Sequence, residues 1–197
     1  SAASDVYKRQ ASPRRVVIVA NHASFLDGAV LSAAIPGELT FVAKHEFSET
    51  FWEGNFLRRL GTIFVKRVDR SAGLKGADEL TEAVREGERV VVFPEGTLLR
   101  RPGLLSFRLG AFAAATAASA AVVPVAIRGT RDVLRGEQWF PRRGAIAVEI
   151  GAPMTVSGTD FEAEVALRDA ARSWIFKHSG EPDLATDTVD LAAMGQL

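Results

Sequence analysis

His22 and Asp27, five residues apart, are the side chains of this sequence best suited to acid–base chemistry. Histidine accepts a proton near neutral pH. A carboxylate bonded to its second ring nitrogen fixes the tautomer and stabilises the imidazolium as it forms. The chain has no cysteine and no Gly-x-Ser-x-Gly motif, which excludes a thiol nucleophile and makes a serine elbow unlikely. We therefore expect a base without a protein nucleophile, so that the substrate supplies the attacking group.

The spacing of this pair constrains the local backbone. On an ideal helix, residues five apart lie roughly 140° from one another, so His22 and Asp27 meet only if residues 21–24 form a turn. Ser24 and Asp27 have the form of a capping box, which predicts that a helix starts there. The alternative is that Asp27 only caps the helix and that His22 is an ordinary loop histidine.

A second cluster, Phe93-Pro94-Glu95-Gly96-Thr97, follows an apolar run. Gly96 permits a positive φ or a close approach of the backbone. Exposed backbone N–H groups, together with Thr97, could hold an oxyanion or a phosphate. An ordinary turn at the end of a strand is the alternative interpretation.

Basic side chains supply a third element of the predicted site. Arg67 is the best candidate for a phosphate clamp, because a guanidinium pairs bidentately with phosphate. Lys44, Arg70, Arg100 and Arg108 could add to the positive field. The alternative is a solvated basic surface, which is the commoner situation for lysine and arginine.

The elements that would position these groups alternate along the chain. Apolar, β-branched runs predict strands over Arg15–Ala20, Leu39–Val42, Thr62–Lys66, Arg89–Phe93, Val122–Ile127 and Ala145–Ile150. Helix-period runs predict helices over Gly28–Ile35, Phe47–Leu60, Ala72–Glu86, Ser106–Ala120 and from a Thr159–Glu162 capping box to Gly180. This alternation predicts a single α/β domain with a largely parallel or mixed central sheet flanked by helices.

Parallel strands would bring the three clusters together, because ligands of open α/β sheets bind beyond the carboxyl ends of the strands. His22 follows the first strand, Lys66-Arg67 closes the third, and Pro94–Thr97 follows the fourth. This convergence at one edge is stronger support for a site than any one motif.

Composition limits the other possibilities. The chain of 197 residues has 24 basic and 24 acidic residues, so its charge does not indicate a nucleic-acid partner. Its three histidines show no metal-ligand spacing, and we expect no metal and no cofactor. No apolar segment is long enough to predict a membrane span. We interpret residues 1–10 as a non-native leader, 11–180 as the domain, and 181–197 as an acidic linker or the start of a truncated further region.

The motifs together resemble the PlsC-type glycerolipid acyltransferases, the lysophosphatidic acid acyltransferase family. The resemblance is carried, in order, by Asn21–Asp27, Phe41–Phe47 with Gly54 and Gly61–Arg67, Phe93–Thr97, and Val122–Val125. The pattern departs from the family at Leu98 and Leu99, where arginine and serine are frequent, and at Phe51-Trp52, near a missing proline.

The resemblance implies a glycerol-3-phosphate acyltransferase-like fold and roles for particular residues. His22 would be the general base and Asp27 its orienting partner. Arg67 and the turn Glu95–Thr97 would hold the phosphate of the acceptor, with Lys44 nearby and Arg100 and Arg108 adding charge.

The implied reaction moves a fatty acyl group from acyl-CoA or acyl carrier protein to the hydroxyl of a lysophospholipid, such as 1-acylglycerol 3-phosphate. The enzyme would be cytoplasmic and peripheral on the inner face of the cell membrane. The segment Phe51–Arg59, with bulky apolar residues and two arginines, is a modest signal for contact with the membrane surface. Alternatives are another lysophospholipid or an amino lipid as acceptor, a thioester hydrolase, and a non-catalytic lipid-binding module.

Overall fold

The computed structural model describes residues 15–43, 67–69, 74–99, 101–134 and 140–186, without the side chains of 43, 67–69 and 74–77. The predicted strand Thr62–Lys66 and helix Phe47–Leu60 lie outside these residues. So do Lys44, Arg70, Arg100 and the segment Phe51–Arg59.

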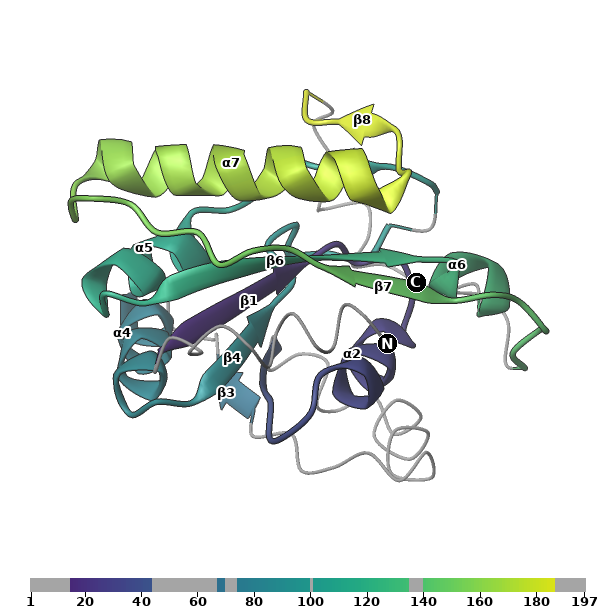
Figure 1. Cartoon of the computed structure of the whole chain (residues 1–197), viewed down its shortest axis with the longest axis horizontal. Helices are drawn as coiled ribbons and strands as arrows, with labels where there is room; N and C mark the ends of the chain where they lie inside the picture. Colours follow the sequence, from purple (N-terminus) through teal and green to yellow (C-terminus); the bar gives the residue numbers. More distant parts are fainter. Residues whose placement is uncertain (1–14, 44–66, 70–73, 100, 135–139, 187–197) are drawn as a thin grey trace.

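A mixed six-stranded sheet forms the centre of the fold, in the order β3-β2-β4-β1-β6-β7 (Figure 1). Its strands are β1 (Val16–Ala20), β2 (Thr40–Ala43), β3 (Arg67–Asp69), β4 (Arg89–Val92), β6 (Ala121–Arg128) and β7 (Ala147–Ile150). All neighbouring pairs are parallel except β6 and β7, which are antiparallel. The prediction of an α/β domain with a largely parallel sheet is therefore confirmed.

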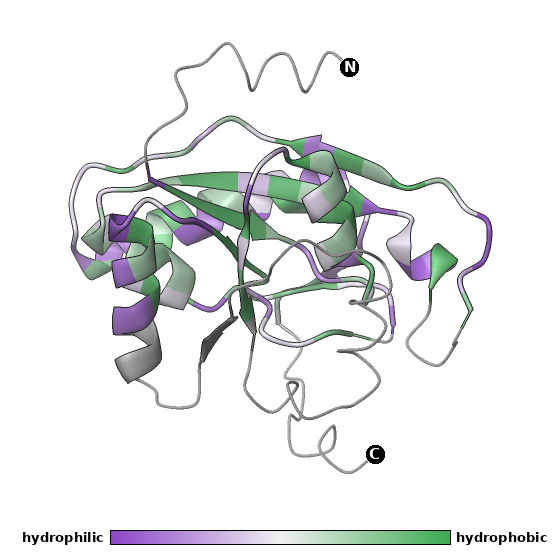
Figure 2. Cartoon of the chain, turned by 90° about the horizontal axis from the view of Figure 1, so that it is seen from below, coloured by the Kyte–Doolittle hydropathy of each residue, from purple (hydrophilic) through white to green (hydrophobic). Residues whose placement is uncertain are grey.

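Helices cover both faces of this sheet. They are α2 (Asp27–Ala34), α4 (Leu74–Arg85), α5 (Gly110–Ala117), α6 (Thr130–Val133) and α7 (Phe161–Ser179). The side chains of Val17 and Val19 join the core formed with α4, α5 and α7, whereas that of Ile18 joins the core formed with α2. Because successive side chains of a strand point to opposite faces, a continuously apolar run is what a doubly covered strand requires. Figure 2 accordingly shows the central strands in mainly hydrophobic colours.

Several predicted helix boundaries are corrected by the structure. Helix α7 is capped by Asp160, whose carboxylate accepts a hydrogen bond from the Ala163 N–H, and not by Thr159. The alanine-rich helix predicted over Ser106–Ala120 is only Gly110–Ala117, since the preceding residues extend toward a short strand. The predicted stop at Gly180 is confirmed, with φ of 73°.

A small second sheet extends the packed domain beyond residue 180. Strand β5 (Leu104–Leu105) pairs in parallel with β8 (Asp183–Leu184). The Arg172 side chain from α7 donates to both carbonyls of β5, at 2.9 Å each, and to the Asp183 carboxylate. Residues 181–184, which the charge pattern assigned to a linker, therefore pack against the loop that follows β4.

The Asn21 side chain joins the end of β1 to the end of β6. Its amide nitrogen donates to the Ile127 carbonyl at 2.9 Å, and its amide oxygen accepts from the Ile127 N–H at 2.8 Å. Asn21 is 1% exposed, so these bonds are shielded from water. They fix the direction in which the chain leaves β1, immediately before His22.

Within the described residues, no helix combines the length and the apolar character needed to cross a membrane.

We predict that Asn21→Ala lowers the free energy of unfolding by about 2–4 kcal/mol, because it leaves the Ile127 N–H and carbonyl buried without partners. Urea denaturation monitored by circular dichroism measures the loss. Ser32→Ala is the control, since it removes a half-buried hydroxyl that donates to the Gly28 carbonyl within α2. Equal effects of the two substitutions would contradict the role of Asn21.

Candidate active site

His22 and Asp27 meet at the carboxyl edge of the sheet, as their spacing allowed. The distance from His22 Nδ1 to Asp27 Oδ2 is 2.9 Å. The chain leaves β1 as a turn, and α2 begins at Asp27, so the two residues do not share a helix. The aspartate side chain is fully buried, whereas the histidine side chain is 21% exposed. A shielded acceptor therefore holds an imidazole that solvent and ligands can reach.

The Asp27 carboxylate also organises the turn that carries the histidine. Its Oδ2 atom accepts from the Ala23 N–H at 2.6 Å and from the Ser24 N–H at 2.8 Å. The bond to Ser24 is one half of the predicted capping box. The other half is absent, because the Ser24 hydroxyl accepts from the Leu26 N–H and donates to the Leu134 carbonyl. The helix consequently starts at Asp27 and not at Ser24.

The bond to Asp27 selects one tautomer of His22. A carboxylate accepts, so Nδ1 carries the hydrogen and Nε2 presents a lone pair. Among the described residues, no group forms a hydrogen bond with His22 Nε2. The arrangement leaves Nε2 as a base directed away from the buried aspartate.

Phe93 fixes the plane of the imidazole. The two rings stack with their centroids 4.2 Å apart and an angle of 18° between their planes. Phe93 follows β4, the strand next to β1, so the stacking links the first and second sequence clusters. Between the bond at Nδ1 and this ring contact, the histidine has little freedom to rotate.

The Glu95 side chain is buried and bonds to the backbone of the protein. It turns inward and is 4% exposed. Oε1 accepts from the His22 N–H at 2.8 Å, and Oε2 accepts from the Leu105 N–H at 2.9 Å. In the structure the Glu95 carboxylate therefore joins the histidine turn to β5, and the part of Glu95 in holding the acceptor's phosphate stays a prediction.

Burial raises the pKa of Glu95 to about 7. The two backbone N–H donors and the positive charge that His22 can carry lower the pKa in part, whereas the nearby Glu181 carboxylate raises it. Loss of hydration disfavours the ionised carboxylate, and two neutral donors compensate for it only partly. The carboxyl group beneath the histidine turn therefore titrates close to neutrality.

The turn at Gly96 brings Arg108 to the site. Gly96 has φ of 73°, and a Cβ atom there would lie 2.6 Å from Arg108 Nε, so the guanidinium lies directly over this glycine. The Gly96 N–H donates to the Phe93 carbonyl at 3.1 Å. The Gly96 N–H is therefore bonded within the turn, and the role of the Gly96–Thr97 turn in holding a phosphate stays a prediction. Thr97 is half-buried in the same segment.

An ion pair holds the loop that follows the turn. Arg131 donates to the Leu99 carbonyl at 2.5 Å and to Glu181 at 3.1 Å, while Glu181 accepts from the Gly103 N–H at 2.5 Å. Both acid and base are 13% exposed. The two ends of the loop, Leu99 and Gly103, are thus held by one pair of side chains.

The structure does not bring the Arg67 backbone to this edge. Arg67 opens β3 and does not close a strand. It is in register with Phe41, which is itself in register with Val91. Two strands, β2 and β4, lie between β3 and β1. The role of Arg67 as a phosphate clamp stays a prediction, as do those of Lys44 and Arg100.

Sequence reasoning missed several of the contacts that build the site. Phe93 and Asn21 were noted only as members of motifs, and neither the Arg131–Glu181 pair nor the inward turn of Glu95 was predicted. The proline after Phe93 was a usable signal, because it ends the strand and leaves the preceding aromatic ring at the sheet edge. The other contacts join residues far apart in the chain.

Comparisons with known proteins agree with this geometry. A family model described as Acyltransferase matches residues 4–128. The lyso-ornithine lipid O-acyltransferase of Pseudomonas aeruginosa is 31% identical over 177 residues, covering 79% of this chain and 65% of that protein. The 1-acyl-sn-glycerol-3-phosphate acyltransferase of Haemophilus influenzae is 29% identical over 145 residues, covering 73% and 60% respectively.

A solved structure shares the fold. The crystal structure of the 1-acyl-sn-glycerophosphate acyltransferase PlsC from Thermotoga maritima matches with a TM-score of 0.67 and 26% identity, over 85% of this chain and 66% of that chain. The chain spans less than two thirds of the length of the two curated relatives above.

We predict that Glu95→Gln lowers the free energy of unfolding by about 1–3 kcal/mol, because the amide nitrogen cannot accept from a backbone N–H. The wild type should also lose stability relative to the variant as the pH rises from about 4.5 to about 7. In that range the folded state retains a proton on Glu95 that the unfolded chain has released.

Urea denaturation at several pH values measures both effects. Glu162→Gln, at an exposed position in α7, is the control. A stability difference between wild type and Glu95→Gln that is independent of pH would contradict the titration of Glu95 in this range.

Proposed function

This chain belongs to the Acyltransferase family, and on that premise we propose that it transfers a fatty acyl group from a thioester donor to the hydroxyl of a lysophospholipid. The observation that carries the proposal is the bond of His22 Nδ1 to a fully buried Asp27, which leaves Nε2 available as a base. The chain has no cysteine, so no cysteine thiolate competes for the acyl group.

The first step is attack by the acceptor. As its hydroxyl oxygen forms a bond to the thioester carbonyl carbon, His22 Nε2 takes the hydroxyl proton. Asp27 stabilises the imidazolium that results, and it is already in place before the reaction begins. General base catalysis of this kind contributes typically about 10²–10⁴-fold.

The second step releases the thiol. The tetrahedral intermediate collapses, the carbon–sulfur bond breaks, and the proton on Nε2 passes to the departing thiolate sulfur. The products are an ester and a thiol, and the histidine returns to its starting state. Holding both substrates in line contributes up to roughly 7–11 kcal/mol, so positioning is expected to exceed proton transfer in importance.

The acceptor is best matched by 1-acylglycerol 3-phosphate, the substrate for which the Haemophilus influenzae relative is named. Arg108, exposed and lying over Gly96, supplies a guanidinium on the turn next to His22. A guanidinium fork fits a phosphate. Arg67, Lys44 and Arg100 would add to this field. The donor is acyl-CoA or acyl carrier protein, and the place of action is the inner face of the cell membrane.

A second acceptor is favoured by one comparison. The Pseudomonas aeruginosa relative is named for lyso-ornithine lipid, which is an amino lipid. The chain also departs from the common third motif at Leu98 and Leu99. An ornithine headgroup has no phosphate. Binding of 1-acylglycerol 3-phosphate would therefore use Arg108 as a phosphate ligand, whereas binding of a lyso-ornithine lipid would not.

We predict that His22→Ala lowers acyl transfer by about 10²-fold or more, because the base is lost. Thiol release and lipid product, measured together, quantify transfer and separate it from thioester hydrolysis. The fold should survive, since Glu95 bonds to the His22 backbone and not to its side chain. His178→Ala, on α7, is the matched histidine control. Near wild-type turnover by His22→Ala would remove this residue from the mechanism.

We predict that Arg108→Ala raises KM for 1-acylglycerol 3-phosphate by about tenfold, since a charge-assisted hydrogen bond is worth roughly 1.5–3 kcal/mol. The KM for a lyso-ornithine lipid should change little. Arg85→Ala, at the end of α4, controls for the loss of one surface charge. Equal changes for both acceptors would mean that Arg108 does not contact phosphate.

A further inference from the structure

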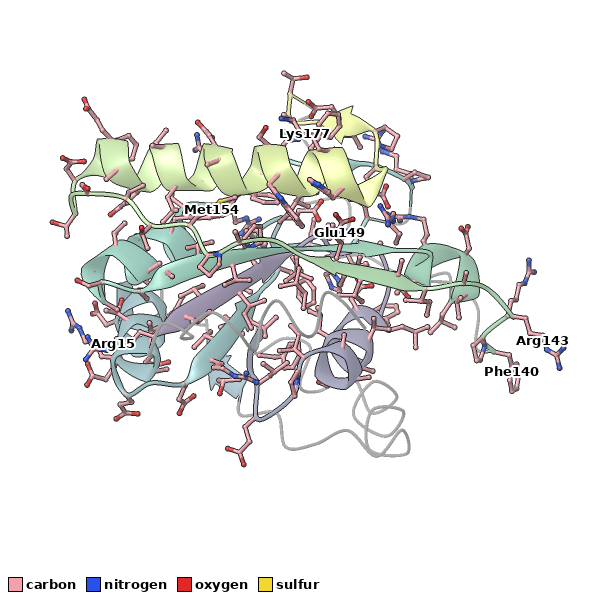
Figure 3. All side chains as sticks on the ribbon, viewed as in Figure 1. Arg15, Phe140, Arg143, Glu149, Met154 and Lys177 are labelled. Atoms are coloured by element: carbon pink, nitrogen blue, oxygen red, sulfur yellow. The ribbon has the colours of Figure 1, made fainter. Side chains whose placement is uncertain are left out.

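The connection between α6 and β7 carries an aromatic side chain that nothing covers among the described residues. Phe140 is 83% exposed, and the neighbouring Arg142 and Arg143 are exposed as well. Figure 3 shows Phe140 and Arg143 at the tip of a projection, pointing away from the body of the protein. We propose that this tip, formed by Phe140, Arg142 and Arg143, docks on the surface of an anionic lipid bilayer.

The tip belongs to the edge of the sheet that carries the candidate site. Strand β6 runs parallel to β1, with Ala20 in register with Val125, so the chain leaves both strands at the same edge. The Ser24 hydroxyl, within the histidine turn, donates to the Leu134 carbonyl at the end of α6 at 2.8 Å. A bilayer in contact with the tip would therefore lie next to the edge where the lipid acceptor must enter.

The base of the projection is held by the body of the protein. The Arg142 N–H donates to the Val133 carbonyl at 2.7 Å. Gly129, with φ of 84°, packs so closely on the Ala145 backbone that a Cβ atom there would lie 2.0 Å from the Ala145 carbonyl oxygen. These contacts fix the direction of the tip, which reduces the conformational entropy lost on docking.

The charge around the tip distinguishes it from another exposed phenylalanine. Phe161, at the start of α7, is 67% exposed, but Asp160, Glu162 and Glu164 surround it in the sequence. An anionic surface repels such a site. It attracts the two arginines beside Phe140, and each basic residue near the membrane strengthens binding by about fivefold.

The shape of the tip favours a bilayer over a protein partner. Figure 1 shows the residues that lead into β7, from Phe140 onward, extending past the carboxyl end of the sheet. Aromatic and apolar side chains that project in this way enter the headgroup region, while adjacent basic groups bind lipid phosphates. Ile146, 39% exposed near the base, adds apolar surface.

The relevance of docking to catalysis rests on the proposed function, because docking helps catalysis only if the substrate is a lipid. The binding of the tip to a bilayer does not depend on the proposed function. Cosedimentation with vesicles measures binding without any turnover, and transfer to a water-soluble short-chain acceptor measures catalysis without any bilayer. The two parts can therefore fail separately.

The experiment compares the wild type with Phe140→Ser and with the double variant Arg142→Gln/Arg143→Gln. Vesicles are of phosphatidylcholine alone or of phosphatidylcholine with phosphatidylglycerol. We expect binding only to the anionic vesicles, weakened by about tenfold in Phe140→Ser and more than tenfold in the double variant. Transfer to the short-chain acceptor should be unchanged. Phe161→Ser is the matched control and should bind as the wild type does.

Other results would overturn the proposal. They are equal binding by Phe140→Ser and the wild type, equal binding to neutral and anionic vesicles, or a wild type that binds neither. A Phe140→Ser variant that alters only self-association would make the tip an interface between two copies of this chain. A variant that alters only the use of acyl carrier protein as donor would make it a protein-docking surface.

Discussion

One buried carboxylate oxygen, Asp27 Oδ2, determines the arrangement of the candidate site. It accepts from the imidazole of His22 and from the N–H groups of Ala23 and Ser24. The two backbone bonds close the turn, and the third bond orients the ring, so the shape of the turn and the tautomer of the base depend on the same atom. A buried anion is costly unless it is paired and hydrogen-bonded. Among the described residues Asp27 Oδ1 is buried without a hydrogen-bond partner, so the three bonds to Oδ2 carry the whole of this compensation.

The sheet supplies the remaining contacts through its strand order. Strand β1 lies between β4 and β6, so the turn after it is adjacent to the ends of both neighbours. Phe93 and Glu95 reach it from β4, and Ile127 binds Asn21 from β6. A histidine at the end of an outer strand would lack the contacts from one of the two neighbouring strands. The central position of β1 thus explains why a short strand can hold the candidate base, His22, firmly in place.

Local patterns in the sequence predicted the sheet and the His22–Asp27 pair, because both follow from side-chain periodicity and from a spacing of five residues. Local patterns did not predict contacts for which two adjacent residues are equally suited, nor contacts between residues far apart in the sequence. Thr159 and Asp160 are both good caps, and only the backbone selects Asp160. The inward turn of the Glu95 side chain has no signature in a single sequence, because its backbone partners are 73 and 10 residues away.

The ion pair formed by Arg131 and Glu181 has a consequence for local motion. Glu181 lies two residues after the end of α7 at Ser179. It accepts a hydrogen bond from the Gly103 N–H, while Arg131 donates to the Leu99 carbonyl. Opening of the 99–103 loop thus requires that the residues after α7 detach as well. Segments joined in this way exchange their amide hydrogens as one cooperative unit. The segment after β4, beside the candidate site, and the residues after α7 would then share a single opening free energy.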